Sequence, residues 1–215
     1  MSYRYNAGDL VSTALLSDFP RAPFRRGKDT ILTLTGILDG TSNTAMLGEA
    51  YITFYMEKNP PKKGGLAEVS IGSSTPPSNC VAALNADQTV TAPDVWALPA
   101  PLVNYFHRRP GLRIFDARNN MSSVNFILPP NSPSCAKSVG TPDSAGLMSV
   151  GSYHQGGANV SMCDGSVRFV SDTIHCGTLS SVPPDGATWL TYIGESLYGV
   201  WGAMGSANGG ESVTL

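Results

Sequence analysis

The chain has 215 residues, enough for one domain with a sizeable hydrophobic core, and we expect residues 1–215 to form a single globular domain. Charged residues make up only 14% of the chain and the formal net charge is −2, so the chain lacks the positive field that attracts nucleic acid or anionic membranes. The 23 glycines and 16 prolines favour many turns and short strands over long helices.

Residues 1–30 lack a clear apolar period and are predicted to form a loop. Regular structure is expected to begin at a weakly alternating segment, residues 31–34, and to continue in a β-branched and aromatic run over residues 44–55, which predicts a strand or a strand pair. We favour a solvated loop for the basic cluster in the first segment, with a docking surface for an acidic neighbour as the alternative. This cluster comprises Arg21, Arg25, Arg26 and Lys28.

Asp39-Gly40 begins a predicted turn, residues 39–43, in which every second residue has an oxygen atom in its side chain. Asp39, Thr41 and Asn43 occupy alternate positions, like the first ligands of a calcium loop. Glu49, however, falls one position short of closing an EF-hand loop. We therefore favour a self-satisfied Asx-type turn and keep a calcium ion bound by Asp39, Thr41 and Asn43 as the alternative; no other cofactor is expected.

The middle of the chain is rich in proline, serine and glycine, which predicts exposed connections between short elements. A short helix is predicted over residues 80–84, and two strands are predicted over residues 112–115 and 124–128. Residues 129–135 contain three prolines, which remove backbone donors and fix φ. This segment is therefore predicted to be an ordered loop or an extended edge.

The four cysteines are Cys80, Cys135, Cys163 and Cys176. They show no CxxC spacing and have no histidine at zinc-finger offsets, so a zinc site is disfavoured. Two disulfides are the favoured interpretation, with mixed or free thiols as the alternative. Of the three possible pairings, we expect Cys163–Cys176 together with Cys80–Cys135.

The next segment predicts a β-hairpin, because Asp164-Gly165 suits the two positive-φ positions of a type I′ turn. Strand residues alternate between the two faces of a sheet. Counting outward from the turn therefore predicts two cross-strand pairs on one buried face, Met162 with Val167 and Val160 with Phe169.

A structural motif is predicted in and before this hairpin, formed by His154, Gly156, Gly157, Asn159, Asp164 and Gly165. An acid–base role for His154 and Asp164 is disfavoured, because the strand between them would hold them ~20 Å apart. We favour a structural histidine that bonds a loop carbonyl, with metal or assembly contacts as the alternative. The chain also lacks a G-x-S-x-G nucleophile elbow and a phosphate loop, so we predict no catalytic residues and no enzyme.

Near the C-terminus, Tyr198, Trp201 and Met204 recur at three-residue intervals and predict one or two helical turns. This segment is the candidate cover for the apolar face of the hairpin. Tyr192, Tyr198 and Trp201 also suggest a platform for stacking sugars, with Tyr198 and Trp201 as candidate ligand-binding residues, although core packing is the favoured use. The whole chain predicts an antiparallel, β-rich α+β fold with long Pro/Gly loops and little helix.

His154, nine intervening residues and Asp164-Gly165 form a specific pattern. The pattern resembles the prepilin-associated H-X9-DG family, domain-of-unknown-function family 1559. The resemblance implies a pilin-like sheet elaborated by long loops, usually preceded by a pilin-like N-terminal helix, and no established biochemical activity. Further stretches carry the resemblance in the same order, namely residues 5–9, 39–49, 128–135, 171–174 and 198–211.

The resemblance implies a non-enzymatic, exported surface or pseudopilin-like domain that acts in assembly or display, in a type IV pilus or type II secretion setting. The expected location is extracellular, at the cell surface or periplasmic. The expected partners are further copies or other pilin-like subunits. The chain has no run of about 18 apolar residues, so we expect a fragment whose membrane contact requires the missing helix. A carbohydrate- or ligand-binding module of the cell surface, with surface glycans as partners, is the alternative.

Overall fold

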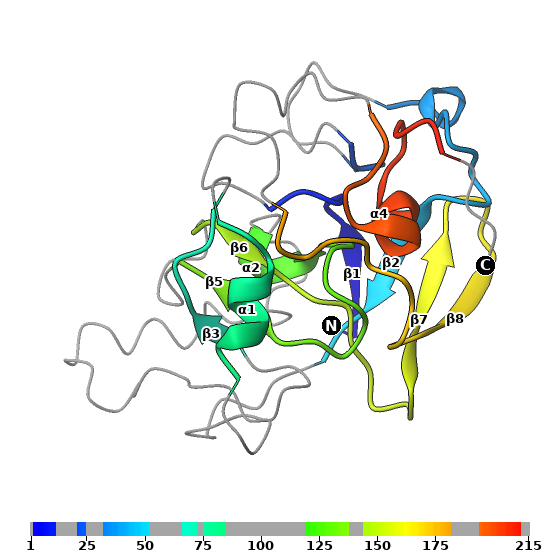
Figure 1. Ribbon diagram of the computed structural model, residues 1–215. Helices are drawn as coiled ribbons and strands as arrows, with labels where there is room; N and C mark the ends of the chain where they lie inside the picture. Colours follow the sequence, from blue (N-terminus) through cyan, green and yellow to red (C-terminus); the bar gives the residue numbers. More distant parts are fainter. Residues whose placement is uncertain are drawn as a thin grey trace.

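The computed structural model describes residues 2–11, 21–24, 32–51, 66–72, 75–84, 119–137, 144–181 and 194–211. These residues form two β-sheets and several short helices (Figure 1). In chain order the elements are β1 (Tyr3–Asn6), the 3-10 helix η1 (Leu34–Gly36), β2 (Ala45–Glu49), β3 (Leu66–Glu68), α1 (Ser78–Ala82), α2 (Asn119–Ser122), β4 (Ser123–Val124), β5 (Ser134–Ala136), β6 (Gly146–Leu147), β7 (Gly157–Met162), β8 (Val167–Ser171) and α4 (Gly199–Gly205).

The larger sheet has the strand order β4-β1-β2-β7-β8, and the smaller sheet has the order β3-β5-β6. Both sheets are mixed, because β1 runs parallel to β4 and β3 runs parallel to β5, whereas the other neighbours are antiparallel. The prediction of a β-rich fold with little helix is confirmed for the described residues. The prediction of an antiparallel sheet is not confirmed, because each sheet contains one parallel pair, whose strands are joined by long connections instead of hairpins.

β1 lies inside the larger sheet, although the sequence predicts a loop over residues 1–30. Its inward-facing side chains, Arg4 and Asn6, are polar and buried, so the strand lacks the apolar alternation by which strands are recognised. The Asn6 side-chain amide donates hydrogen bonds to the carbonyl oxygens of Ala45, at 2.8 Å, and Gly205, at 3.0 Å. Hydrogen bonds to β2 and α4 thus hold β1 in place, whereas other strands are held by apolar packing.

Most other predicted elements lie near their expected positions. The run over residues 44–55 contains β2, and the helix predicted over residues 80–84 overlaps α1. Of the strand predicted over residues 124–128, only the first residue belongs to β4, and the buried residues that follow are irregular. Residues 32 and 33 are irregular and lead into η1 at Leu34, so no strand forms in the described part of residues 31–34. The strand predicted over residues 112–115 lies outside the described residues.

The inner face of the larger sheet is covered by α4 (Figure 1). Trp201 and Met204 belong to the same buried cluster as Val160 and Met162 of β7. The Trp201 indole N–H donates a hydrogen bond to the Leu128 carbonyl oxygen at 2.7 Å, which leaves no polar atom of this large side chain unpaired. The prediction that the Trp201 segment covers the hairpin is therefore confirmed.

The β7–β8 hairpin forms where expected but with a different turn and register. The Gly165 N–H donates to the Met162 carbonyl at 3.0 Å, the Met162 N–H donates to the Ser166 carbonyl at 2.8 Å, and Gly165 has a φ of 87°. Asp164 is not among the positive-φ residues, so the predicted type I′ turn is wrong. The observed pattern is a turn followed by a left-handed glycine, a G1 bulge, which adds one residue to the second strand.

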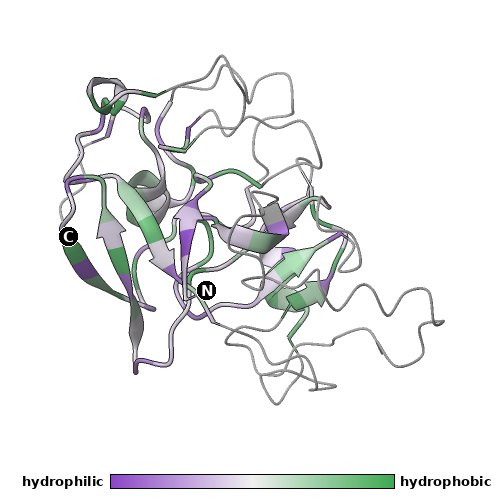
Figure 2. Ribbon diagram, turned by 180° about the vertical axis from the view of Figure 1, so that it is seen from behind, coloured by the Kyte–Doolittle hydropathy of each residue, from purple (hydrophilic) through white to green (hydrophobic). Residues whose placement is uncertain are grey.

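The extra residue reverses the faces of β8. Phe169 lies opposite Asn159 and Val167 lies opposite Ser161, so the predicted pairs Met162–Val167 and Val160–Phe169 are wrong. Val167 and Phe169 are 64% and 55% exposed, while Val170 is buried on the inner face in their place. A shift of one residue exchanges the two faces of a strand. The observed register therefore places hydrophobic residues on both faces of β8, and Figure 2 shows the hydrophobic bands along this strand.

Candidate functional site

The end of β2 and the loop before β7 meet on the outer side of the larger sheet, around Glu49. One Glu49 carboxylate oxygen lies 3.5 Å from His154 Nε2 and accepts a hydrogen bond from the Tyr3 hydroxyl at 3.5 Å. The other accepts a hydrogen bond from the Asn159 N–H at 2.6 Å. Desolvation raises the pKa of Tyr3, and the charge of Glu49 and the hydrogen bond to it act in the same direction. The Glu49 carboxylate therefore joins three strands, β1, β2 and β7, and the loop that carries His154.

His154 itself lies at the surface, with 58% of its side chain exposed. Its ring also contacts Phe169 edge to face, with 6.3 Å between the ring centroids. The expected bond to a loop carbonyl is thus replaced by a carboxylate partner, Glu49, which was considered only as a possible end of the calcium loop. The sequence held one indication of this pair: Glu49 is the last residue of the family-like segment 39–49, and His154 is the first residue of the pattern that ends in Asp164-Gly165.

The backbone of the His154 loop is fixed by Asn131, which lies in the family-like segment 128–135 but is not among the predicted site residues. Its side-chain oxygen accepts a hydrogen bond from the Ser152 N–H at 2.9 Å, and its amide donates to the Gly157 carbonyl at 3.2 Å. Asn131 has a φ of 67°, which asparagine tolerates better than most residues. The Tyr51 hydroxyl donates a hydrogen bond to the Ser152 carbonyl. Burial raises the pKa of Tyr51, and the electrostatic effects of Tyr153 and Glu49 raise it further.

The two predicted motif glycines have separate roles in this loop. Gly156 has a φ of 76°, a conformation that strains residues with a side chain. Gly157 begins β7 and is buried, and a Cβ atom there would overlap the carbonyl oxygen of Val170 on β8. The glycines therefore allow a tight entry into the hairpin, as the motif predicted.

Asp164 lies at the opposite end of β7 from His154 and is fully exposed. It accepts hydrogen bonds from the Ser166 hydroxyl at 2.7 Å and the Ser166 N–H at 2.9 Å, and these bonds lower its pKa more than the nearby Arg168 does. This arrangement is an Asx-type turn. The structure does not bring His154 and Asp164 together as an acid–base pair.

The second Asp-Gly turn packs against the first. The Asp164 N–H donates to the Thr41 carbonyl at 3.0 Å, and the Cys163 N–H donates to the Thr44 carbonyl at 2.9 Å. Two segments that appear in the sequence as unrelated turns of similar chemistry thus form one contact at the tip of the hairpin.

The predicted calcium ligands occupy a polar corner beside the C-terminal segment. The Asp39 carboxylate accepts hydrogen bonds from the N–H groups of Gly209, at 2.7 Å, and Gly210, at 2.8 Å. The Asn43 side chain donates to the Asp39 carbonyl at 3.0 Å. Both Asp39 carboxylate oxygens are thereby used by the protein itself. Within the described part of the chain, no group of three or more His, Cys, Asp or Glu side chains is arranged to hold a metal.

Tyr198 and Trp201 are buried, with 1% and 0% of their surfaces exposed, so the predicted sugar-stacking platform does not form from them. The Tyr198 ring belongs to the buried cluster that includes Ile127 and Leu147, and the Trp201 ring belongs to the cluster that includes Val160 and Met162. Burial, together with the charge of Asp9, raises the pKa of Tyr198. Tyr192, the third residue of the predicted platform, lies outside the described residues.

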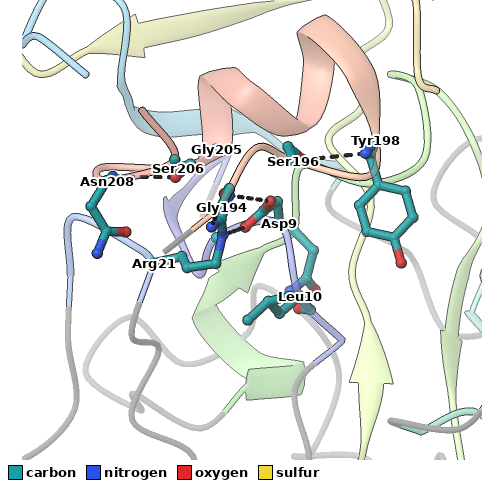
Figure 3. A network of polar contacts seen from close by, with 12 residues as sticks. Asp9, Leu10, Arg21, Gly194, Ser196, Tyr198, Gly205, Ser206 and Asn208 are labelled. Atoms are coloured by element: carbon teal, nitrogen blue, oxygen red, sulfur yellow. Dashed lines mark hydrogen bonds and ion pairs between the residues drawn. The ribbon is translucent and has the colours of Figure 1, made fainter. Parts of the chain in front are cut away.

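Arg21 is buried, which contradicts the prediction of a solvated basic loop for this member of the cluster; Arg25, Arg26 and Lys28 lie outside the described residues. Arg21 Nε donates to one Asp9 oxygen at 2.7 Å, Nη2 donates to the other at 3.1 Å, and Nη1 donates to the Gly194 carbonyl at 2.6 Å (Figure 3). A two-pronged ion pair of this kind satisfies the planar guanidinium and lets it enter the interior. Arg21 thus connects the N-terminal segment to the chain before α4.

Arg4 is a second buried guanidinium that could not be recognised from the sequence. It donates a hydrogen bond to the Tyr51 carbonyl at 2.8 Å, while its Nε has no partner. Burial lowers its pKa to about 10. This cation holds the start of β1 to the end of β2.

The disulfide Cys80–Cys135 is present and joins α1 to β5, as predicted. The second predicted bridge is wrong, since Cys163 and Cys176 are free thiols. Cys163 follows the turn end of β7, whereas Cys176 follows the far end of β8, so the length of the hairpin separates them. Burial raises the pKa of Cys163 to about 11 and that of Cys176 to about 12, which keeps both thiols protonated at neutral pH.

Comparison with known proteins identifies the family. The sequence profile of the family described as "Protein of unknown function (DUF1559)" matches residues 5–177, so the chain belongs to this family, and the suspected resemblance is confirmed. No curated protein and no solved structure matches the chain significantly. Among the described residues, no helix is long and apolar enough to cross a membrane.

Proposed function

From the membership of this chain in a family of unknown function and from its exposed sheet surface, we propose that it is a non-enzymatic, exported domain of the surface or pseudopilin-like type. Its role is assembly or display. The proposal includes a pilin-like use of the larger sheet, in which strands present one face to the core and the other to neighbouring subunits.

The observation that carries this proposal is the apolar outer face of the larger sheet. Val167 and Phe169 are 64% and 55% exposed, and Tyr3 on β1 is 41% exposed. The β1–β2 and β7–β8 registers place Tyr3, Glu49, Asn159 and Phe169 on this face. Apolar side chains gathered on one face of a folded domain mark surfaces that bind other macromolecules.

The polar residues of the family-like segments support a scaffolding role. Asp39 binds backbone amides near the C-terminus, Glu49 binds the N–H of Asn159, and Asp164 binds its own turn. Groups that are engaged in this way hold segments together and are not poised to attack or protonate a substrate. The pattern from His154 to Asp164 therefore determines the local backbone structure of the hairpin and its entry loop.

The disulfide supports export. Cys80 and Cys135 are both completely buried and form one bridge between distant segments. Structural disulfides of this kind persist in extracellular and periplasmic compartments and are rare where thiols are kept reduced.

A ligand-binding module is the second candidate, at a different position from the one that the sequence suggested. Tyr153 is 82% exposed and stands edge-on against Tyr51, with ring centroids 4.7 Å apart. His154 and Glu49 lie beside it and supply polar groups. An exposed aromatic ring next to hydrogen-bonding side chains is a suitable surface for a sugar.

Intact cells that produce the full-length protein provide the test. Protease added from outside should digest this domain, and a membrane-impermeant cross-linker should join it to further copies or to other subunits of one assembly. Survival of the domain in intact, protease-treated cells would contradict export and display. Binding to a glycan array that is lost in Tyr153→Ser and kept in a variant of another exposed ring, Phe24→Ser, would favour the second candidate.

A further inference from the structure

β8 forms one edge of the larger sheet, and no described strand pairs with its outer side. The opposite edge, β4, has only two residues, and the chain continues from it into a bridge between Asn125 and Ser149. β8 has five residues and contains no proline or lysine, the residues that commonly protect an edge. Among the described strands it is therefore the longest edge open to pairing.

The hydrogen-bonding groups of β8 fall into two sets. The Met162 N–H donates to the Ser166 carbonyl and the Asp172 N–H donates to the Gly156 carbonyl, so residues 166, 168, 170 and 172 direct their backbone groups toward β7. In an antiparallel ladder the alternate residues face away. Val167, Phe169 and Ser171 thus present their N–H and C=O groups at the open edge, and Val167 and Phe169 also have exposed side chains.

We propose that this edge binds a second copy of the same chain, with the two β8 strands antiparallel about a two-fold axis at Val170. In this register Phe169 lies opposite Ser171 of the second copy, and their outward backbone groups exchange hydrogen bonds. The larger sheets of the two copies then form one continuous sheet. Because both copies use the same edge, no third copy can add through it, and the assembly formed by this contact is a dimer.

The charges on β8 select this partner and this register. About an axis at Val170, Arg168 of each copy lies directly opposite Asp172 of the other, which gives two cross-strand ion pairs. Arg168 and Asp172 are partly exposed, and neither forms an ion pair within the described part of the chain. An axis at Arg168 would instead oppose the two arginines, and like charges directly opposite each other are destabilising.

This inference gives the assembly proposed above a specific partner and surface, and it rests on that proposal for its biological meaning. The test is analytical ultracentrifugation of the purified chain over a concentration series. We expect a reversible monomer–dimer equilibrium. Amide hydrogen exchange of Val167, Phe169 and Ser171 should slow as the dimer fraction rises, whereas exchange of the β7 amides should not change with concentration.

Charge exchange gives a stricter test. Arg168→Asp places two carboxylates opposite each other in the dimer, and Asp172→Arg places two guanidinium groups opposite each other. Each variant alone should therefore dimerise at least about tenfold more weakly than the original chain. An equimolar mixture of the two variants should form heterodimers in which each of the two opposed pairs joins a carboxylate to a guanidinium group, so mixing should restore dimerisation close to the original affinity.

The double variant R168D/D172R restores both complementary pairs, because each aspartate then lies opposite an arginine of the second copy. It should dimerise about as tightly as the original chain. Lys137→Glu, which changes the net charge as Arg168→Asp does but lies beyond β5 of the other sheet, should leave dimerisation unchanged. A double variant that dimerises as weakly as the single variants would overturn the proposed register.

A chain that stays monomeric at all concentrations would overturn the inference, and so would an Arg168→Asp variant that dimerises as tightly as the original. In the second case self-association through another surface would stand, and with it the proposed role in assembly. If a single variant does not fold, the hydrogen-exchange experiment on the original chain still decides the question: protection at β7 alone, independent of concentration, overturns pairing at β8.

Discussion

Removing the Cys80–Cys135 disulfide should destabilise the domain strongly, because the bridge closes a long loop. The two cysteines are separated by 55 residues, and the chain-entropy relation for a loop of this length gives about 4 kcal/mol at 25 °C. For a domain of this size each kcal/mol shifts the melting temperature by about 2–4 °C. The variant Cys80→Ala/Cys135→Ala should therefore melt about 8–16 °C below the original chain.

Thermal unfolding followed by circular dichroism measures this shift. A double variant avoids the need to reduce a bridge that is buried in the folded protein. The matched control is Cys163→Ala/Cys176→Ala, which removes the two free thiols and should cost only about 1 kcal/mol for the lost sulfur contacts. A control that loses as much stability as the test variant would refute the assigned pairing. Alkylation of the unfolded, unreduced chain should accordingly label two cysteines and leave two unlabelled.

Three further substitutions test the fold, each measured by chemical denaturation. Trp201→Ala should cost about 3–5 kcal/mol, because it empties the space between α4 and the larger sheet; a smaller loss than Val170→Ala would contradict the central position of α4. Gly165→Val should destabilise the hairpin more than Gly165→Asn, since asparagine tolerates a φ of 87° better than a β-branched residue, and equal losses would remove the argument for the bulge. His154→Ala should cost less than about 1 kcal/mol, because its partner Glu49 keeps other hydrogen bonds and the His154 side chain is 58% exposed; a loss of several kcal/mol would contradict this surface position.

The sequence could predict features that depend on local pattern. The hairpin, the helical turn around Trp201 and the short helix near Cys80 each follow from residues close together in the chain. The Cys80–Cys135 pairing was also predicted, as a link between the middle of the chain and the proline-rich segment. These elements are present in the described structure.

Polar contacts between distant segments could not be predicted in this way. Arg21 binds Asp9 and Gly194, and Asp39 binds Gly209 and Gly210. The spacing of apolar residues in the sequence does not indicate such contacts, because a buried arginine and a solvated arginine can have the same neighbours in the sequence. The same holds for β1, whose inward residues are polar and form hydrogen bonds to other segments.

The register of the hairpin depended on a single backbone conformation. Asp-Gly is compatible with a two-residue type I′ turn and with a turn closed by a G1 bulge, and the two differ by one residue in the return strand. The contacts of Asp164 and Cys163 with Thr41 and Thr44 hold the tip in the second form. These contacts come from a segment over a hundred positions earlier, which the local pattern could not include.

The functional proposal follows from this difference in register. With the two-residue turn, Val167 and Phe169 would lie in the core, and the outer face of β8 would carry Ser166, Arg168 and Val170, with one apolar side chain instead of two. The bulge instead places both side chains outside and leaves Val170 to fill the core. A conformation that exposes two apolar side chains on an unprotected edge strand lowers solubility, and a fold can retain it where another chain covers that edge. Gly165, which makes the bulge possible, therefore links the pattern that defines the family to the surface on which the proposed assembly depends.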